Sequence, residues 1–383
     1  MKVYRIGILG CGMISRTYAA DMKAFYHQLS IVACADILPA SARKLADEFG
    51  IPKACTPDEL LNDPDVDIVI NLTPPQLHVE LNRKIILAGK HLFSEKPFAQ
   101  TVKEAEELAA LAKEKGVRIG CAPDTFLASG LQSVRYYLDA GLIGKPFFVT
   151  ANMTTFGAET WHPNPAPFYA RGSGPLYDMA PYYLSALVAL LGPVESVAAL
   201  CAKPRDTRHV YAGPRAGAEI PCEVPTHYSA LLRMRCGAIV SLNVTYDVWR
   251  SNLPMFEIYG DSGTITYPDP NFGGGTPRVY RKEQYTDPLY QHTPEAEARR
   301  ETFRELPEVF TRPKDYSRGI GVLDLAAAID RNGKNRASGE LIIHITEIIE
   351  GLKASAESGA FQLMRTACER PEPLTPGCAL DKL

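Results

Sequence analysis

The chain has 383 residues, 46% hydrophobic and 22% charged, with a formal net charge of -3, so it is long enough for two domains and lacks the positive charge that nucleic acid or an anionic membrane attracts. Its longest apolar stretch, residues 184–191, is far shorter than the roughly 20 residues that span a bilayer, and glycines interrupt the N-terminal apolar run where a signal peptide would continue. Nine cysteines without disulfide or metal-ligand spacing indicate reduced thiols, and we expect a cytoplasmic protein that binds no nucleic acid, membrane or metal.

Short β-branched runs alternate with helical patterns in the first third of the chain. The expected strands cover residues 3–9, 29–35, 67–72, 91–94 and 118–122, and the expected helices between them cover residues 13–22, 41–49, 76–88 and 103–115. Alternation with short connections requires right-handed crossovers and a parallel sheet with helices on both faces. The predicted class is α/β, and residues 1–123 are expected to form a doubly wound nucleotide-binding domain of the Rossmann type.

The pattern changes after residue 123. A helix over residues 130–140, a strand over 146–153, an aromatic-rich loop and a long apolar helix over 176–191 come first. Strands with a two-residue period then cover residues 194–202, 226–234, 238–246, 255–260 and 263–268, and helices over 321–331 and 338–355 follow. Hairpin-like turns favour antiparallel pairing. Residues 124–383 are thus expected to be an α+β domain for substrate binding and oligomerisation, with a large, mostly antiparallel open sheet.

The first strand runs into a glycine loop of sequence GCGMIS. Gly10 permits a sharp turn, and Gly12 lets the backbone approach a pyrophosphate, whose charge the free N–H groups of the helix beginning at Met13 and Ile14 stabilise. Ser15 stands where a third glycine is usual, but it still permits close helix–strand packing. Because unrelated glycine turns share this spacing, the loop alone is a weak indication of a dinucleotide site.

The second expected strand ends at Asp36. A carboxylate at this place accepts hydrogen bonds from both ribose hydroxyls of NAD and repels the 2′-phosphate of NADP. Ile37, next to it, is counted with the cofactor-binding residues. Arg43 lies further along and keeps NADP open as an alternative, and an ordinary polar strand end is the alternative for Asp36. Together with the glycine loop, this carboxylate predicts a nicotinamide dinucleotide site that prefers NAD.

The third and fourth expected strands end in polar sequences, at the edge where open α/β sheets bind their ligands. The third strand runs into residues 72–78, LTPPQLH, and the fourth ends in residues 95–97, EKP. With the glycine loop and Asp36, these stretches resemble the glucose–fructose oxidoreductase/inositol dehydrogenase (Gfo/Idh/MocA) family of oxidoreductases. The resemblance covers nearly the whole chain, and its most specific local element is the EKP sequence.

The resemblance implies a role for each matching residue. It implies that Leu72, Thr73 and His78 line the cofactor and that Glu95 reaches toward the nicotinamide ribose. Lys96 would lie beside both the nicotinamide and the substrate hydroxyl. A lysine in a partly desolvated crevice is expected to have a lowered pKa and to exchange a proton near neutrality. An exposed strand-end lysine is the alternative for Lys96, and a helix-start cap is the alternative for His78.

The family's second signature is a glycine-rich turn followed by Asp-x-x-x-His, and it corresponds here to residues 172–182, GSGPLYDMAPY. Asp178 and Tyr182 are four residues apart, so they share one helix face and address one substrate. Tyrosine replaces the usual histidine, as it does in glucose–fructose oxidoreductase and the dihydrodiol dehydrogenases. We expect Lys96 to lower the pKa of this phenol, and either side chain is then the main acid/base. Aromatic packing for Tyr182 and helix capping for Asp178 are the alternatives.

Four further residues are candidates for contacts with the substrate. Trp161 offers a flat apolar face for a sugar ring, and His162 beside it offers a group for hydroxyls. A lid or a subunit contact is the alternative for their loop. Asp124 follows the fifth strand at the domain junction, and Arg318, in a late loop, offers donors for hydroxyls or a carboxylate unless it forms a structural salt bridge.

The sequence therefore predicts an NAD-dependent dehydrogenase or reductase that acts on a secondary hydroxyl of a sugar, polyol or glycoside, with Lys96, Asp178 and Tyr182 as its catalytic residues. Two other classes stay open: a redox-assisted glycosidase or lyase that works through a 3-keto intermediate, and a non-catalytic sensor of NAD or sugar. The half-apolar open sheet of the second domain needs a cover, which predicts a homodimer or homotetramer formed through it.

Overall fold

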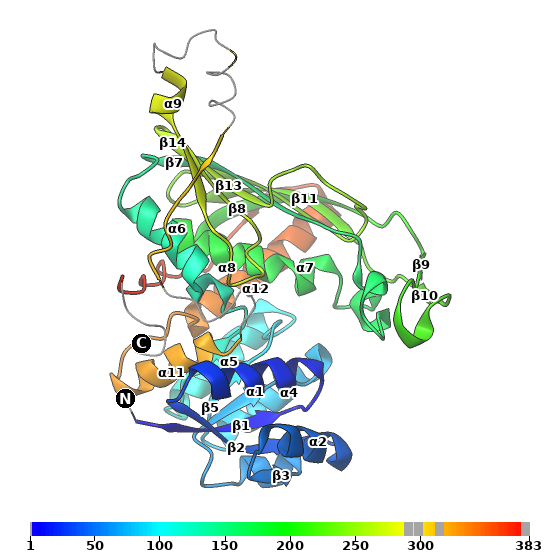
Figure 1. The fold of residues 1–383 in the computed structure, drawn as a ribbon. Coiled ribbons are helices and arrows are strands. Elements are labelled where there is room, and N and C mark those ends of the chain that lie inside the picture. Colours follow the sequence, from blue (N-terminus) through cyan, green and yellow to red (C-terminus); the bar gives the residue numbers. More distant parts are fainter. Residues whose placement is uncertain (1, 287–293, 295–301, 311–317, 377–383) are drawn as a thin grey trace.

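The computed structural model describes residues 2–286, 294, 302–310 and 318–376. The described residues build two large β-sheets, a six-stranded sheet at the bottom of Figure 1 and a nine-stranded sheet at the top, with helices between them. A small pair of strands, β9 (Thr207–His209) and β10 (Glu219–Pro221), extends to one side of the larger sheet.

The N-terminal sheet is parallel throughout, in the order β3-β2-β1-β4-β5-β6. Its strands are β1 (Tyr4–Leu9), β2 (Leu29–Ala35), β3 (Lys53–Cys55), β4 (Ile68–Asn71), β5 (His91–Ser94) and β6 (Ile119–Cys121). This is the strand order of dinucleotide-binding folds, in which the ligand crevice opens where the order reverses, between β1 and β4. The predicted doubly wound sheet is confirmed.

Helices cover both faces of this sheet. The apolar residues of the first two helices join one core cluster, and those of the next three join a second cluster on the opposite face. These helices are α1 (Met13–Phe25), α2 (Pro39–Phe49), α3 (Pro57–Leu61), α4 (His78–Leu87) and α5 (Val102–Glu114). Thr56 and Thr101 close capping boxes with Glu59 and Glu104, so the starts of α3 and α5 are set by local sequence.

The second sheet has nine strands in the order β16-β15-β14-β13-β7-β12-β11-β8-β17. Among the described strands, β7 and β12 pair in parallel and the other neighbours pair antiparallel. The mostly antiparallel sheet is therefore confirmed. Its strands are β7 (Pro146–Thr154), β8 (Val194–Ala202), β11 (His227–Met234), β12 (Ile239–Thr245), β13 (Phe256–Gly260), β14 (Gly263–Tyr267), β15 (Arg278–Arg281), β16 (Arg304–Glu305) and β17 (Gln362–Leu363).

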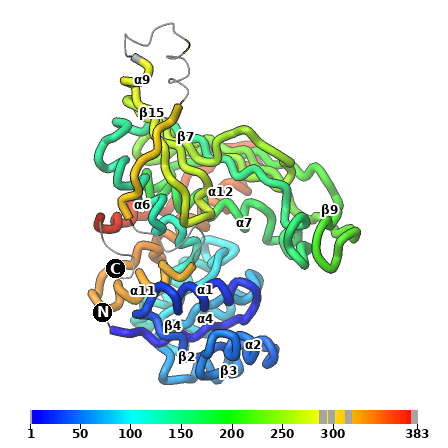
Figure 2. Tube along the Cα trace, in the orientation of Figure 1, coloured from blue at the N-terminus to red at the C-terminus, as the bar shows by residue number. Residues whose placement is uncertain are grey.

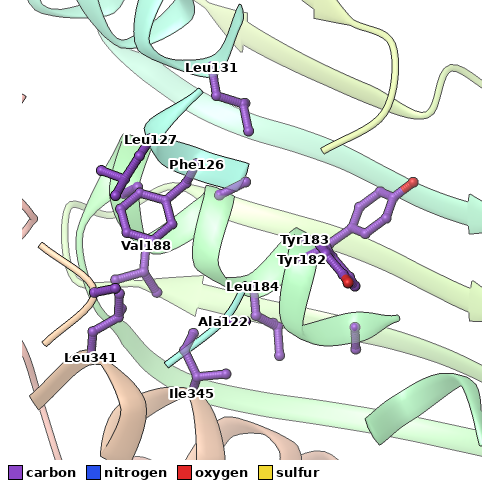
Figure 3. Packing of buried hydrophobic residues seen from close by; sticks show 14 of the residues in the cluster. Ala122, Phe126, Leu127, Leu131, Tyr182, Tyr183, Leu184, Val188, Leu341 and Ile345 are labelled. Carbon is purple, nitrogen blue, oxygen red and sulfur yellow. The ribbon is translucent and has the colours of Figure 1, made fainter. Parts of the chain in front are cut away.

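One face of the larger sheet packs on three helices, α6 (Ser129–Asp139), α8 (Ala180–Leu191) and α12 (Gly339–Ser358). Every residue of α8 is buried, which explains its uninterrupted apolar sequence. Figure 3 shows Val188 of α8 beside Phe126, and Leu184 beside Ile345 of α12. Burial of these side chains joins the sheet, α8 and the junction with the N-terminal sheet into one core.

The predicted helix over residues 176–191 is wrong in one respect, because the structure divides it. A short helix, α7 (Pro175–Asp178), ends before Met179, and α8 begins at Ala180. Pro181 has no backbone N–H to donate within a continuous helix, and its ring disfavours helical geometry in the preceding turn. Asp178 and Tyr182 therefore do not share one continuous helix face, although both contact Lys96, as shown below.

Helix α11 (Ile320–Asp330) lies late in the chain but packs on β5 and β6 of the N-terminal sheet. Figure 2 shows α11 in orange beside the blue N-terminal part of the chain. The Tyr4 hydroxyl donates to Asp330 at 3.0 Å. Gly321 approaches Phe93 so closely that a Cβ on this glycine would lie 2.7 Å from the ring. The boundary at residue 123 stays a prediction, and the chain beyond it supplies one of the helices of the N-terminal sheet.

The structure bears on two expectations from composition, the absence of a membrane-spanning helix and the presence of reduced cysteines. Among the described residues, no helix has the length and apolar character needed to cross a membrane. The eight cysteines of the described ranges are free thiols, and Cys378 lies outside them.

His344 of α12 gives the fold a pH-dependent stability. The imidazole is fully buried, its Nε2 accepts the Val194 N–H at 3.0 Å, and its Nδ1 lies 3.0 Å from the Thr366 hydroxyl, which donates to Glu347. Desolvation lowers the pKa of His344 from 6.5 to about 4. Between these two pH values the folded state therefore binds fewer protons than the unfolded state. The contribution of His344 to the free energy of unfolding is fully present above pH 6.5 and decreases as the pH drops toward 4.

We predict that the free energy of unfolding decreases by up to about 3 kcal/mol between pH 6.5 and pH 4 through this residue. Urea titrations across this range measure it. His344→Gln should be less stable at neutral pH and should show a shallower decrease, whereas His27→Gln, at an exposed position, should retain the full decrease. Equal slopes for all three proteins would contradict the prediction.

Candidate functional site

The glycine loop joins β1 to α1 at the point where the strand order reverses. Gly10 has φ +96°, and a Cβ there would lie 2.8 Å from the backbone carbon of Leu72, so the fold itself requires glycine. Gly12 has an ordinary φ of -77°, and a Cβ there would meet nothing within 4 Å. Among the described residues, none fills the space over Gly12, and no side chain caps the adjoining N-terminus of α1. This cradle fits the pyrophosphate of a dinucleotide.

A cavity of about 700 Å³ continues from the glycine loop across the end of β2. Asp36 lies in its wall, where its carboxylate accepts the N–H of Cys11 at 2.8 Å and the N–H of Leu38 at 2.9 Å. Ile37, Leu38 and Leu77 line the cavity with exposed apolar side chains, and Ile37 is 80% exposed. An apolar slot with one fixed carboxylate is suited to an adenine ring and its ribose hydroxyls.

The other predicted cofactor residues divide between the cavity and the core. Leu72 and Thr73 line the cavity. Met13, the first residue of α1, is 59% exposed, and Ile14 packs partly against the core. His78 is buried, with its ring nitrogens 2.7 Å and 2.8 Å from the carbonyl oxygens of Pro97 and Thr73. His78 therefore ties the loop after β4 to the loop after β5. Its ring does not cap α4, so the helix-start alternative does not describe these contacts, and its role at the cofactor stays a prediction.

Glu95 follows β5 and is nearly buried. Its carboxylate accepts the Tyr18 hydroxyl at 3.0 Å and the N–H of Lys96 at 3.0 Å. Tyr18 lies on α1 and is fully buried. The sequence analysis did not select Tyr18, because an apolar helix face predicts a core tyrosine and gives no sign of its polar partner. The helix that carries the phosphate cradle thus also holds Glu95.

The three predicted catalytic residues meet at the carboxyl edge of the N-terminal sheet. The Lys96 ammonium donates to the Asp178 carboxylate, and it donates to the Asp178 carbonyl at 2.8 Å. The same nitrogen lies 5.4 Å from the centre of the Tyr182 ring. Lys96 comes from the loop after β5, Asp178 from the end of α7 and Tyr182 from the first turn of α8. The site is therefore assembled across the two parts of the fold.

A fourth residue of this cluster was not predicted. Tyr246, immediately after β12, is buried, and its hydroxyl donates to the second oxygen of the Asp178 carboxylate. Its position continues the inward-facing series of Val240, Leu242 and Val244. The two-residue period therefore signals burial of Tyr246, but it cannot signal the partner, which lies 68 residues away in the chain.

Arg318 and Asp124 border the cluster in different ways. Arg318 is 3% exposed, donates to the Tyr182 hydroxyl at 3.3 Å, and has its guanidinium 5.6 Å from the ring. Asp124 is fully buried and accepts the N–H groups of Gly319 and Gly321 at 3.2 Å and 2.9 Å. Asp124 thus holds the start of α11, and with it the backbone next to Arg318, instead of presenting its carboxylate to a crevice.

Trp161 and His162 are placed elsewhere. Trp161 is 62% exposed, and its ring lies 5.2 Å from that of His162 and 6.1 Å from that of Phe168. These contacts stay within the loop between β7 and α7. Within the described residues the structure does not bring either ring into contact with Lys96, Asp178 or Tyr182, and their role in substrate binding stays a prediction.

Both pKa expectations for the catalytic residues are wrong in direction. Desolvation is the largest influence on Lys96 and lowers its pKa, but Asp178, Tyr182 and Glu95 together raise it above the ordinary lysine value. Desolvation raises the pKa of Tyr182, and the opposing influence of Arg318 and Lys96 is smaller. In this arrangement both side chains hold their protons at neutral pH, so the cluster is a proton donor before a substrate enters.

Comparison with known proteins agrees with this geometry. The model of the oxidoreductase family with an NAD-binding Rossmann fold matches residues 4–122, and the model of the GFO/IDH/MocA C-terminal domain matches residues 131–266. Together they cover more than half of the chain.

Relatives of this chain include dehydrogenases and another oxidoreductase. D-xylose dehydrogenase of Paenarthrobacter nicotinovorans is 33% identical over 45% of this chain and 46% of its own length, and levoglucosan dehydrogenase of Pseudarthrobacter phenanthrenivorans is 25% identical over 70% and 74%. An uncharacterised oxidoreductase of Escherichia coli is 28% identical, over 49% of this chain and 54% of its own length. The matched part thus spans about half the length of two of these relatives.

The fold is shared with aldose-aldose oxidoreductase from Caulobacter crescentus, at a TM-score of 0.75 and 21% identity over 95% of this chain and all of that one. The phosphate cradle, the carboxylate of Asp36 and the two matching domain models lead to one assignment. The chain belongs to the Gfo/Idh/MocA family of oxidoreductases, and its N-terminal part is an NAD-binding Rossmann fold.

Proposed function

We propose that this protein is an NAD-dependent dehydrogenase that oxidises a secondary hydroxyl of a sugar, polyol or glycoside, or reduces the corresponding carbonyl. The observation that carries the proposal is the Lys96–Asp178–Tyr182 cluster at the edge of an NAD-binding sheet. The names of the relatives support the substrate class, because they include dehydrogenases of D-xylose, levoglucosan and scyllo-inositol.

The residues of the cluster divide the proton transfer between them. When bound, the nicotinamide supplies the hydride acceptor or donor. In reduction, the Lys96 ammonium donates a proton to the carbonyl oxygen, and in oxidation the neutral amine must accept the proton of the hydroxyl. Tyr182 accepts a hydrogen bond from Arg318 and keeps its own O–H for the substrate oxygen. Asp178 holds the ammonium and restricts where Lys96 points.

The cavity walls support a preference for NAD over NADP. The Asp36 carboxylate is fixed by two backbone N–H groups and would repel a 2′-phosphate. Arg43 is exposed and lies outside the cavity wall. Lys84, a cation in that wall, is paired with Glu80 at 2.7 Å. In the described cavity wall, the cation that could bind a 2′-phosphate is therefore already paired with a carboxylate.

We further infer that two or four copies associate through the nine-stranded sheet. The face turned away from α8 and α12 carries exposed apolar side chains on neighbouring strands, with Leu200 of β8 at 71%, Leu231 of β11 at 51% and Leu363 of β17 at 80%. Covering such a face with a second copy removes apolar area from water.

Incubation of the purified protein with NAD⁺ and each of D-xylose, levoglucosan and scyllo-inositol tests the function. We expect at least one compound to produce the absorbance of reduced nicotinamide, and Lys96→Ala to lower kcat/KM about 10²- to 10⁴-fold. Lys113→Ala, at an exposed position of α5, is the matched control and should be unchanged. Cleavage of a glycoside without net NADH would favour the redox-assisted glycosidase, and NAD binding without turnover would favour the sensor.

The pH dependence tests the protonation of Lys96. Because Asp178, Tyr182 and Glu95 outweigh desolvation and raise its pKa, the neutral amine needed for oxidation becomes populated only at alkaline pH. We predict that kcat/KM for oxidation rises with pH and reaches no plateau below about pH 10, near the ordinary lysine value. Carbonyl reduction should stay constant across neutral pH. A plateau of the oxidation profile near pH 7 would contradict this assignment.

Asp36 determines the nucleotide preference in this proposal. Asp36→Asn removes the charge that holds the ribose hydroxyls and repels the 2′-phosphate, so the Kd for NAD should rise about tenfold while that for NADP falls. Calorimetric titration with both nucleotides measures the change. Asp47→Asn, an exposed position on α2, should leave both constants unaltered, and an unchanged ratio in Asp36→Asn would show that other groups select the cofactor.

A further inference from the structure

A buried network of charged side chains contacts the backbone of Tyr246. Its centre is Arg208 of β9, which is only 1% exposed although β9 belongs to the small side extension of the fold. The Arg208 guanidinium donates to the Tyr246 carbonyl at 2.6 Å, to Glu159 at 2.7 Å and to the Asp247 carboxylate. One side chain thus joins the end of β12 to the loop after β7.

All four carboxylate oxygens of this network have donors. One Glu159 oxygen accepts Arg208 and the other accepts the Tyr169 hydroxyl. One Asp247 oxygen accepts Arg208 and also Arg205 at 2.7 Å, and the second accepts the Thr226 hydroxyl at 2.5 Å. Glu159 is fully buried. A network satisfied at every oxygen is rigid, because each alternative position leaves a buried charge without a partner.

This rigidity is transmitted to Tyr246 by three contacts. Its carbonyl is held by Arg208, its N–H donates to the Thr226 carbonyl at 2.9 Å, and the Tyr169 ring packs edge-on against its ring at 6.2 Å and 74°. The hydroxyl at the other end of the same side chain donates to Asp178, on the oxygen that Lys96 does not use. Arg208 is therefore connected to the Lys96 ammonium through Tyr246 and Asp178: hydrogen bonds join neighbouring residues, and the Tyr246 residue itself spans from its carbonyl to its hydroxyl.

A buried ionic network is a poor source of stability, since apolar residues of similar volume often stabilise as well or better. The network of Arg208, Glu159 and Asp247 is better explained by the fixed position that it gives to Tyr246. We propose that Tyr246 and Arg208 are positioning residues, which fix the Asp178 carboxylate and thereby aim the Lys96 ammonium at the substrate oxygen. The proposal rests on the proposed function for its kinetic consequence, but its structural consequence, a restrained Lys96, is independent of any substrate.

Two variants interrupt the path at different points. Tyr246→Phe removes only the hydroxyl, and Arg208→Lys keeps the charge but loses the planar fork that contacts three partners. Tyr183→Phe is the matched control, because it also removes a buried hydroxyl that donates to a carboxylate, in this case Asp269 at 3.1 Å. Asp269 is not one of the residues that connect Arg208 to Lys96, so the control lies off the path. Figure 3 shows the rings of Tyr182 and Tyr183 leaving α8 in different directions.

The first measurement uses the full chain and the probe compound among D-xylose, levoglucosan and scyllo-inositol that the wild type oxidises. Both variants should lower kcat about 10- to 100-fold and leave the Kd for NAD unchanged. The double variant should be no worse than the poorer single variant, because both changes interrupt one path. Losses that multiply, or a kcat equal to that of the wild type and of Tyr183→Phe, would overturn the proposal.

The second measurement needs no activity. Acetic anhydride labels free amines, and mass spectrometry reports the rate at Lys96, with exposed Lys113 as the internal reference. Lys96 should react severalfold faster in Tyr246→Phe and Arg208→Lys than in the wild type and in Tyr183→Phe. An unchanged rate would overturn the positioning role, even if no probe compound is oxidised and the proposed function itself fails. Because Tyr246→Phe deletes a single oxygen, it decides the question if Arg208→Lys does not fold.

Discussion

The contact between Lys96 and Asp178 is the interaction on which the site depends, because it joins the two sheets of the fold at the edge where the cofactor binds. Lys96 follows β5 of the N-terminal sheet, and Asp178 ends α7 beside the larger sheet. Both side chains are mostly removed from water, at 15% and 19% exposure. Charges so placed lose much of their hydration, and only close partners offset that cost. Tyr246 on one carboxylate oxygen, Lys96 on the other and Tyr18 on the neighbouring Glu95 provide such partners.

The same neighbouring groups determine the protonation states of Lys96 and Tyr182 in the free protein. Burial alone would push Lys96 toward a neutral amine, yet Asp178, Tyr182 and Glu95 together outweigh it. For Tyr182 the balance is reversed, because burial outweighs two cations that lie beside the ring. Lys96 and Tyr182 therefore both keep their protons at neutral pH. Neighbouring groups raise the pKa of Lys96, whereas burial raises the pKa of Tyr182. In the proposed reaction, a site arranged in this way would donate a proton to a carbonyl oxygen, whereas oxidation of an alcohol would first require the loss of a proton from Lys96.

The sequence predicted elements wherever a local pattern is sufficient. The strands over residues 29–35, 91–94 and 194–202 have the predicted bounds, because each contains an apolar run that is flanked by polar residues or proline. The strands β3 and β9 were missed, since three mostly exposed residues carry no such pattern. Lys96, Asp178 and Tyr182 were found through motifs with fixed spacing. Tyr246, Tyr18 and Arg208 were not, because their polar partners are distant in the chain and only the folded structure brings them together.

Helix α1 connects the glycine loop to the loop that carries Lys96. Its first residue, Met13, lies at the phosphate cradle, and Tyr18, about 7.5 Å further along the axis, holds Glu95. Glu95 in turn accepts the N–H of Lys96. The backbone of Lys96 is therefore tied to α1 through Glu95, and in our proposal Arg208 and Tyr246 hold the Asp178 carboxylate that Lys96 contacts. Contacts that begin at α1 thus end at the Lys96 backbone, and contacts that begin at Arg208 end at the Asp178 carboxylate beside its ammonium.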